Sequence, residues 1–64
     1  MNAQVTPIKY PSADELMAFE DGQLDEDQTV ELFQRLIDTG LAWQLQGFYG
    51  RTAVQLINAG LCNR

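Results

Sequence analysis

The sequence contains no histidine and one cysteine, Cys62, among 64 residues. Without histidine there is no zinc site of mixed His and Cys ligands, and no His-based triad or general base. A lone cysteine cannot form an internal disulfide. No apolar run approaches the roughly 20 residues that span a bilayer, and the N-terminus lacks the charged-then-apolar pattern of a signal peptide. We therefore expect a cytoplasmic protein without membrane span, metal or cofactor.

Basic residues are also scarce, with four Lys and Arg against nine Asp and Glu and a net charge of −5. All nine acids lie between Asp14 and Asp38, so residues 1–38, with two basic residues, carry −7. Residues 39–64 have no acid and two arginines, which gives +2. Nucleic-acid binding depends on a basic surface, so this balance argues against a nucleic-acid partner.

The chain is short for a self-sufficient core. A domain of this size buries a smaller fraction of its surface than a larger one, and neither a disulfide nor a metal is available to stabilise it. Association with another chain can supply the missing burial. The sequence therefore predicts a homodimer or a stable complex with another protein.

The hydrophobic pattern predicts an all-α fold, a small bundle of three to four short helices. Residues 1–11 contain two prolines and no helical period, which predicts an extended N-terminal arm. Residues 12–64 form the single helical domain. Its core is predicted from the apolar positions of the helices and their connector: Leu32, Phe33, Leu36, Ile37, Trp43, Leu45, Leu56 and Ile57.

Capping residues place the helix ends. Ser12 and Glu15 have capping-box spacing, so the first helix should span residues 13–21 and end at a glycine. The second should start after Asp25 and end before Gly40, with a Glu31–Arg35 pair on its outer face. A short helical turn follows at residues 41–46, and the last helix should span residues 49–59.

Three further features concern the last third of the chain. Gly47 and Gly50 flank two aromatic residues, and at least one glycine is predicted to have positive φ or to touch a neighbouring backbone. The last helix should end in a glycine cap. Leu61 is predicted to fold back onto the helix as the apolar contact of that cap.

The segment from Asp21 to Asp25 resembles the centre of a calcium-binding EF-hand loop. The same register puts Met17 and Phe19 at positions that must supply oxygen ligands, and Gln28 where a bidentate carboxylate is needed. We therefore exclude specific calcium binding. A helix end followed by a helix start explains the segment better.

Two groups of residues are candidates for binding a partner protein. The first is an acidic surface that could engage a basic partner or simply be a solvated face. Its candidate residues are Glu20, Asp21, Asp25 and Asp27. The second is the aromatic set Trp43, Phe48 and Tyr49. Aromatic residues often anchor interfaces, but in a small chain they can equally form the core.

Residues 42–57 also resemble the second half of a helix-turn-helix, in which Arg51 would face DNA. The spacing to Gly47 is one residue too long, and the acidic charge opposes DNA binding. For catalysis, the chain offers only carboxylates, tyrosines, Lys9 and Cys62, and a small helical domain has little room for a pocket that perturbs them. We expect no enzymatic activity.

The run I-D-T-G-L-A-W-Q-L-Q-G, followed by Y-G-R-T-A, lies within Leu32–Cys62. This half of the chain resembles short uncharacterised proteins encoded by tailed bacteriophages. The resemblance implies a phage protein that acts in the bacterial host, for example by inhibiting a host or defence protein. It transfers no catalytic or ligand-binding residue. Binding to a protein is the main hypothesis, and a DNA-binding regulator or a structural component of the phage are the alternatives.

Overall fold

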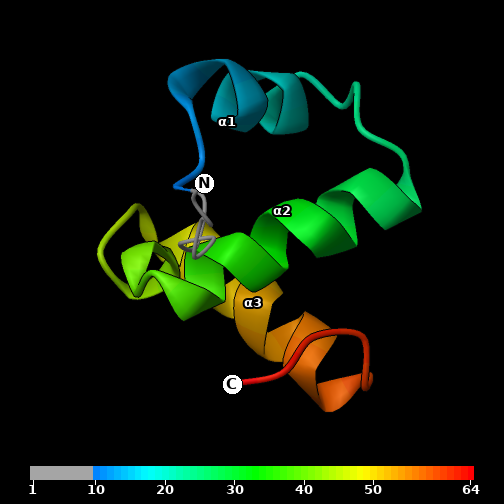
Figure 1. Cartoon of the computed structure of the whole chain (residues 1–64), viewed down its shortest axis with the longest axis vertical. Coiled ribbons are helices and arrows are strands. Elements are labelled where there is room, and N and C mark those ends of the chain that lie inside the picture. Colours follow the sequence, from blue (N-terminus) through cyan, green and yellow to red (C-terminus); the bar gives the residue numbers. More distant parts are fainter. Residues whose placement is uncertain (1–9) are drawn as a thin grey trace, which may run out of the picture.

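The computed structural model describes residues 10–64, and within them the chain forms three α-helices and one short 3₁₀ helix (Figure 1). These elements, in chain order, are α1 (Ala13–Glu20), α2 (Glu26–Asp38), η1 (Leu41–Trp43) and α3 (Gly47–Asn58). The predicted all-α fold is confirmed. The extended arm lies almost wholly outside the described residues, and of its two described members Tyr10 is exposed and Pro11 is half-buried.

The first two helices start at the predicted caps. At α1 the Ser12 hydroxyl accepts from the Glu15 N–H, and the Glu15 carboxylate accepts from the Ser12 N–H. At α2 the Asp25 carboxylate accepts from the Gln28 N–H, and the Gln28 side-chain oxygen accepts from the Asp25 N–H. These reciprocal bonds satisfy backbone donors that have no partner inside a helix. Gly40, with φ 81°, ends α2 as predicted.

The last helix differs from the prediction at both ends. It begins at Gly47, two residues before the predicted start, without a side-chain cap. At its end the Leu61 N–H donates to the Leu56 carbonyl, as in a Schellman motif. Leu61 nevertheless remains 44% exposed, whereas Cys62 is 2% exposed. The prediction that Leu61 supplies the apolar contact is therefore wrong, because the chain turns one residue further before it reaches the core.

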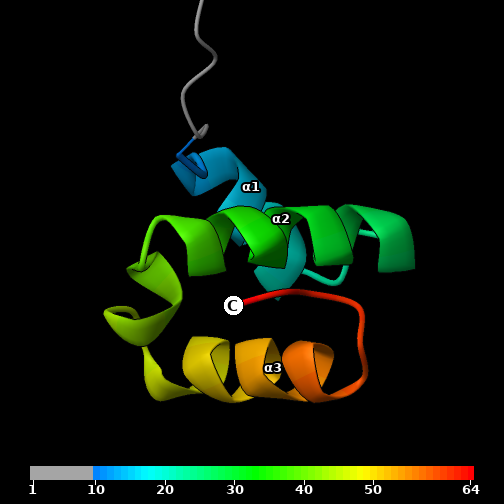
Figure 2. The ribbon, with the colours of Figure 1, turned by 60° about the horizontal axis from the view of Figure 1, so that its bottom comes forward.

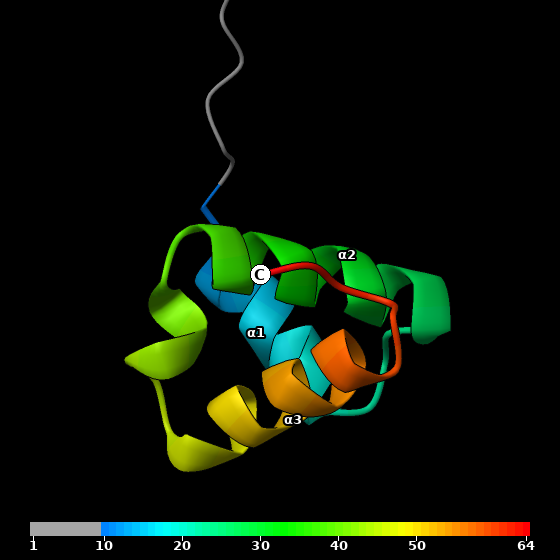
Figure 3. The same ribbon diagram turned by 90° about the horizontal axis from the view of Figure 1, so that it is seen from below.

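In the view of Figure 2, α2 and α3 run in opposite directions and η1 joins them at one end, whereas Figure 1 shows that they cross at a steep angle. Figure 3 shows α1 lying behind both of them, and the C-terminal tail returning along α2. The Gln34 side chain holds this tail through both backbone groups of Asn63, as the amide nitrogen donates to the carbonyl and the amide oxygen accepts from the N–H, each at 2.8 Å. The tail therefore closes one side of the α2 and α3 pair.

Half of the buried core residues were predicted from the sequence. Four predicted residues of α2 are buried, namely Leu32, Phe33, Leu36 and Ile37. Three more pack against the core while only partly buried: Leu45, Leu56 and Ile57. The prediction for Trp43 is wrong, because η1 turns Ala42 inward and leaves Trp43 42% exposed. Tyr49 is also buried, in agreement with the core interpretation of the aromatic set. The other buried residues were absent from the predicted core: Ala42, Ala53 and Cys62.

The two connector glycines lie inside α3, where neither has positive φ. The part of the prediction that concerns φ is therefore wrong. Close backbone approach is confirmed at Gly50, because a Cβ atom there would lie 3.4 Å from the Ala42 carbonyl oxygen. Gly50 thus lets α3 pack closely against η1.

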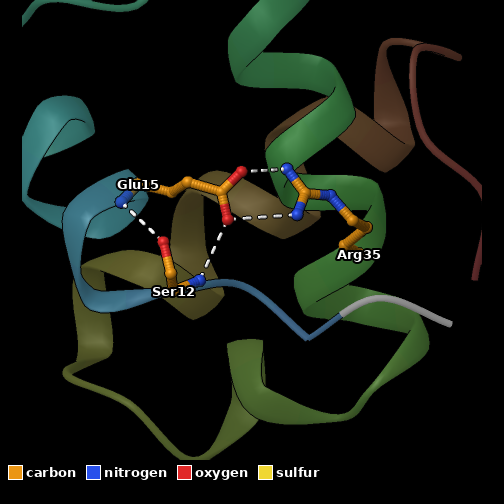
Figure 4. Close-up of polar contacts among 3 residues, drawn as sticks. All are labelled: Ser12, Glu15 and Arg35. Carbon is orange, nitrogen blue, oxygen red and sulfur yellow. Dashed lines mark hydrogen bonds and ion pairs between the residues drawn. The ribbon is translucent and has the colours of Figure 1, made fainter.

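Arg35 of α2 pairs with Glu15 of α1 instead of its predicted partner Glu31 (Figure 4). The guanidinium donates to both carboxylate oxygens of Glu15, at 3.1 and 2.6 Å. This bidentate pairing is the strong geometry in which an arginine binds a carboxylate. It raises the pKa of Arg35, and it holds α1 on α2.

Candidate functional site

An open hollow of about 490 Å³ lies on the exposed side of η1 and α3. Trp43 lines it from η1, and the other lining residues come from α3: Gly47, Gly50, Arg51, Val54 and Gln55. Their spacing of three, four and seven residues places these α3 positions on one helical stripe. We call this surface the Trp43 hollow.

Trp43 forms one wall of the hollow. Its ring packs close to Gly50, where a Cβ atom would lie 3.7 Å from Trp43 Cε3. The Arg64 guanidinium carbon lies 4.9 Å from the ring centroid, within the range of a cation–π interaction. Trp43 is thus held in place on the surface although 42% of it remains exposed. Such a fixed, exposed aromatic ring is typical of a binding anchor.

The floor of the hollow is backbone. Gly47 and Gly50 have no side chains to fill it, and Val54, 40% exposed, lies one turn further along α3. The Arg51 side chain bends back toward the start of the helix, since a Cβ atom at Gly47 would lie 3.1 Å from Arg51 Nη1. The lining is therefore apolar with one cation at its edge, and Arg64 adds a second cation beside Trp43.

The other two predicted aromatics face the interior. Phe48 and Tyr49 contact each other with ring centroids 4.3 Å apart, and Phe19 of α1 and Phe33 of α2 complete the cluster. The Tyr49 hydroxyl donates to Glu20 Oε2 at 2.6 Å. Burial, and after it the hydrogen bond to Glu20, together raise the pKa of Tyr49 to about 12. This cluster joins the three α-helices and belongs to the core.

The four predicted acidic residues have different environments. Glu20 accepts from Tyr49, and Asp25 caps α2. Asp21 is the C-terminal cap residue of α1, and Asp27 lies in the first turn of α2. All four are exposed, but two of them also have clear structural roles. The predicted partner-binding residues therefore separate into three groups. The four acids lie around the connection between α1 and α2, and Phe48 and Tyr49 belong to the core. Trp43 and Arg51 come together in the Trp43 hollow.

A second hollow, of about 250 Å³, lies between α1 and α2. Both ends of the Glu15–Arg35 ion pair line it, beside Glu31 and Gln28, so its cation already has a carboxylate partner. Cys62 offers no reactive thiol, because burial first and then Asp38 raise its pKa. In residues 10–64 no group of three or more Asp, Glu or Cys side chains is placed to hold a metal ion. The Trp43 hollow is therefore the better candidate site.

The helix-turn-helix interpretation needs a short helix over residues 41–46 before the turn. The structure has only the three-residue η1 there, and residues 44–46 connect it to α3 without a helix. Arg51 and Gln55 do face outward, but beside the exposed ring of Trp43 and over a floor of glycines. This surface differs from the polar, basic face of a recognition helix.

The family model of a domain of unknown function, DUF7417, matches residues 11–64. The chain belongs to this family. All the described helices and the whole Trp43 hollow lie within the DUF7417 match. No curated protein and no solved structure matches the chain. Of the helices described in this DUF7417 member, none is both long and apolar enough to cross a membrane.

Sequence reasoning identified Trp43 and Arg51 but missed the rest of the hollow. Gly47 and Gly50 were assigned to a sharp connector, although their spacing with Val54 fits one helical stripe. The earlier helix start is what places them on a common face. The Arg64 contact depends on the path of the C-terminal tail, which no local pattern indicates.

Proposed function

We propose that this protein is a phage-encoded accessory protein that acts by binding another protein in the bacterial host, with the Trp43 hollow as its contact surface. The observation that carries the proposal is the exposed Trp43 ring fixed beside an apolar, glycine-floored hollow. Exposing such a ring to water is unfavourable, and a partner that covers it gains both area and shape complementarity. The phage origin is supported by the resemblance over Leu32–Cys62.

The proposed action is inhibition or modulation of a host or defence protein by occupancy. The hollow has no nucleophile, and no general base lines it. The chain would act by covering a surface that the partner needs. The acidic surface at Asp21, Asp25 and Asp27 would steer the encounter only toward a basic region of the partner separate from the segment in the hollow. A DNA-binding regulator or a structural component of the phage are the competing proposals.

A pull-down from bacterial lysate tests this function. We expect the wild-type chain to retain one stoichiometric protein, and Trp43→Ala to lose it. Tyr10→Ala is the matched control, because Tyr10 is a large aromatic residue, 66% exposed, that does not line the hollow. Circular dichroism should show that both variants fold. Retention of nucleic acid in place of a protein would refute the proposal and favour the DNA-binding alternative.

A further inference from the structure

The charges around the Trp43 hollow have one sign. Arg51 lines it and Arg64 lies over Trp43, while no carboxylate is among its lining residues. All nine carboxylates of the chain lie between Asp14 and Asp38, before η1 and α3 begin. A protein with a net charge of −5 therefore presents a cationic edge beside the exposed apolar side chains of Trp43 and Val54. The occupant that complements this edge is an anion with an apolar side.

The shape of the hollow favours a helix as the occupant. Its α3 stripe extends from Gly47 to Gln55, about 12 Å at 1.5 Å per residue, or slightly more than two helical turns. The space over the two glycines is already occupied, by the Arg51 side chain at Gly47 and by η1 at Gly50, so the open part of the stripe lies toward Val54 and Gln55. A volume of about 490 Å³ accommodates bulky apolar side chains. Recognition by an added β-strand is not available, because residues 10–64 contain no strand whose edge could pair with one.

We propose that the Trp43 hollow binds an acidic amphipathic helix of the partner protein. Bulky apolar side chains of that helix, spaced three or four residues apart, enter the hollow between Trp43 and Val54. Carboxylates that flank this apolar stripe pair with Arg51 and Arg64. This proposal rests on the proposed function and adds the chemistry of the partner, which the acidic surface of the chain alone would not predict.

The single tryptophan of the chain provides the readout, because Trp43 lies in the hollow itself. Two synthetic helical peptides serve as probes. Both carry Leu and Phe at helical spacing, and they differ only in flanking Glu or flanking Lys. We expect the Glu peptide to change the fluorescence of Trp43 and to bind about three- to tenfold more tightly than the Lys peptide, since each exposed ion pair contributes little. Amide NMR shifts should locate binding on η1 and α3.

Charge reversal at Arg51 gives the sharper test. Arg51→Glu should reverse the preference, so that the Lys peptide binds more tightly, and the exposed site near the start of α3 tolerates a carboxylate. Glu26→Lys is the control, because it changes net charge by the same amount at the exposed start of α2 with the opposite sign. It should leave the Glu peptide preferred.

Three results would overturn the proposal. The first is equal affinity of both peptides, or shifts outside η1 and α3. The second is tighter binding of a single-stranded DNA oligonucleotide than of the Glu peptide, which would assign the surface to nucleic acid. The third is a Trp43 signal that depends on protein concentration without peptide, which would assign it to a second copy. If Arg51→Glu does not reverse the peptide preference while Trp43→Ala still loses the lysate partner, the proposal of protein binding stands. Only the proposal that the occupant is an acidic helix is then refuted.

Discussion

At the scale of single residues, the contact between Tyr49 and Glu20 joins α3 to α1 inside the aromatic cluster. Tyr49 is only 3% exposed, and its pKa is raised to about 12, first by burial and then by Glu20. A phenol in the unfolded chain titrates near pH 10. Above that pH the unfolded state loses the proton first, so the stability present below pH 10 is lost as the pH rises toward 12.

We predict that the free energy of unfolding falls by about 2–3 kcal/mol between pH 9 and pH 12. The Tyr49 pKa is raised from about 10 to about 12, and each pKa unit corresponds to ~1.36 kcal/mol. Urea unfolding across this range measures the fall. Tyr49→Phe should be less stable at pH 8, because Glu20 loses its donor, yet should show a smaller fall. Tyr10→Phe, which removes an exposed phenol, is the control and should retain the wild-type fall. A fall in Tyr49→Phe as large as that of the wild type would contradict the prediction. Cys62, whose pKa is also raised, contributes to the fall in both proteins.

Sequence reasoning at this scale succeeded where a residue type and its neighbours along the chain decide the structure. The caps at Ser12 and Asp25 and the left-handed glycine Gly40 follow from local backbone chemistry. Trp43 was misplaced because hydrophobicity predicts burial without specifying which side of a 3₁₀ turn faces the core. Arg35 was misassigned because an i, i+4 partner is visible in sequence, whereas Glu15 lies twenty positions away.

At the scale of elements, α1 depends on a few side chains for its position. It has eight residues, none fully buried, and so is too short to be stable alone. Phe19 enters the aromatic cluster, and both oxygens of the Glu15 carboxylate accept from Arg35, while Oε1 also accepts from the Ser12 N–H (Figure 4). One carboxylate thus both starts the helix and docks it on α2.

Glu15→Gln separates these two roles, because glutamine can still complete the capping box but cannot pair as an anion with Arg35. We predict that it lowers the free energy of unfolding by about 1 kcal/mol, as the pair is partly exposed to solvent. Hydrogen exchange of the α1 amides should accelerate more than that of α2.

The control is Glu31→Gln, which removes the carboxylate that sequence spacing alone would pair with Arg35. It should change stability by no more than a few tenths of a kcal/mol, the size of an exposed helical pair. If Glu31→Gln destabilised the protein as much as Glu15→Gln, Arg35 would be paired along α2 in solution. The docking of α1 described above would then be wrong.

At the scale of the whole molecule, large apolar side chains remain exposed in separate places of residues 10–64. Trp43 and Val54 line the hollow, and Met17 lies on α1. The order of the helices was predictable because each ends at a local signal. The positions of these exposed side chains on the folded molecule were not predictable, because they depend on how α1 and the C-terminal tail lie against α2 and α3.

The short chain predicts a homodimer, and we expect its interface to include Met17 of α1, whose large apolar side chain is 58% exposed. Light scattering at micromolar concentration should give about twice 7.2 kDa. Dilution should lower the melting temperature, since dissociation precedes unfolding of a dimer. Met17→Glu should yield a monomer, because the new carboxylate faces its own copy across a twofold interface. Trp43→Ala should remain dimeric.

Two outcomes would contradict this prediction. A dimer that is lost in Trp43→Ala but kept in Met17→Glu would assign the hollow to self-association. A monomer at all concentrations would show that the core closed by α1, α2 and α3 suffices for stability.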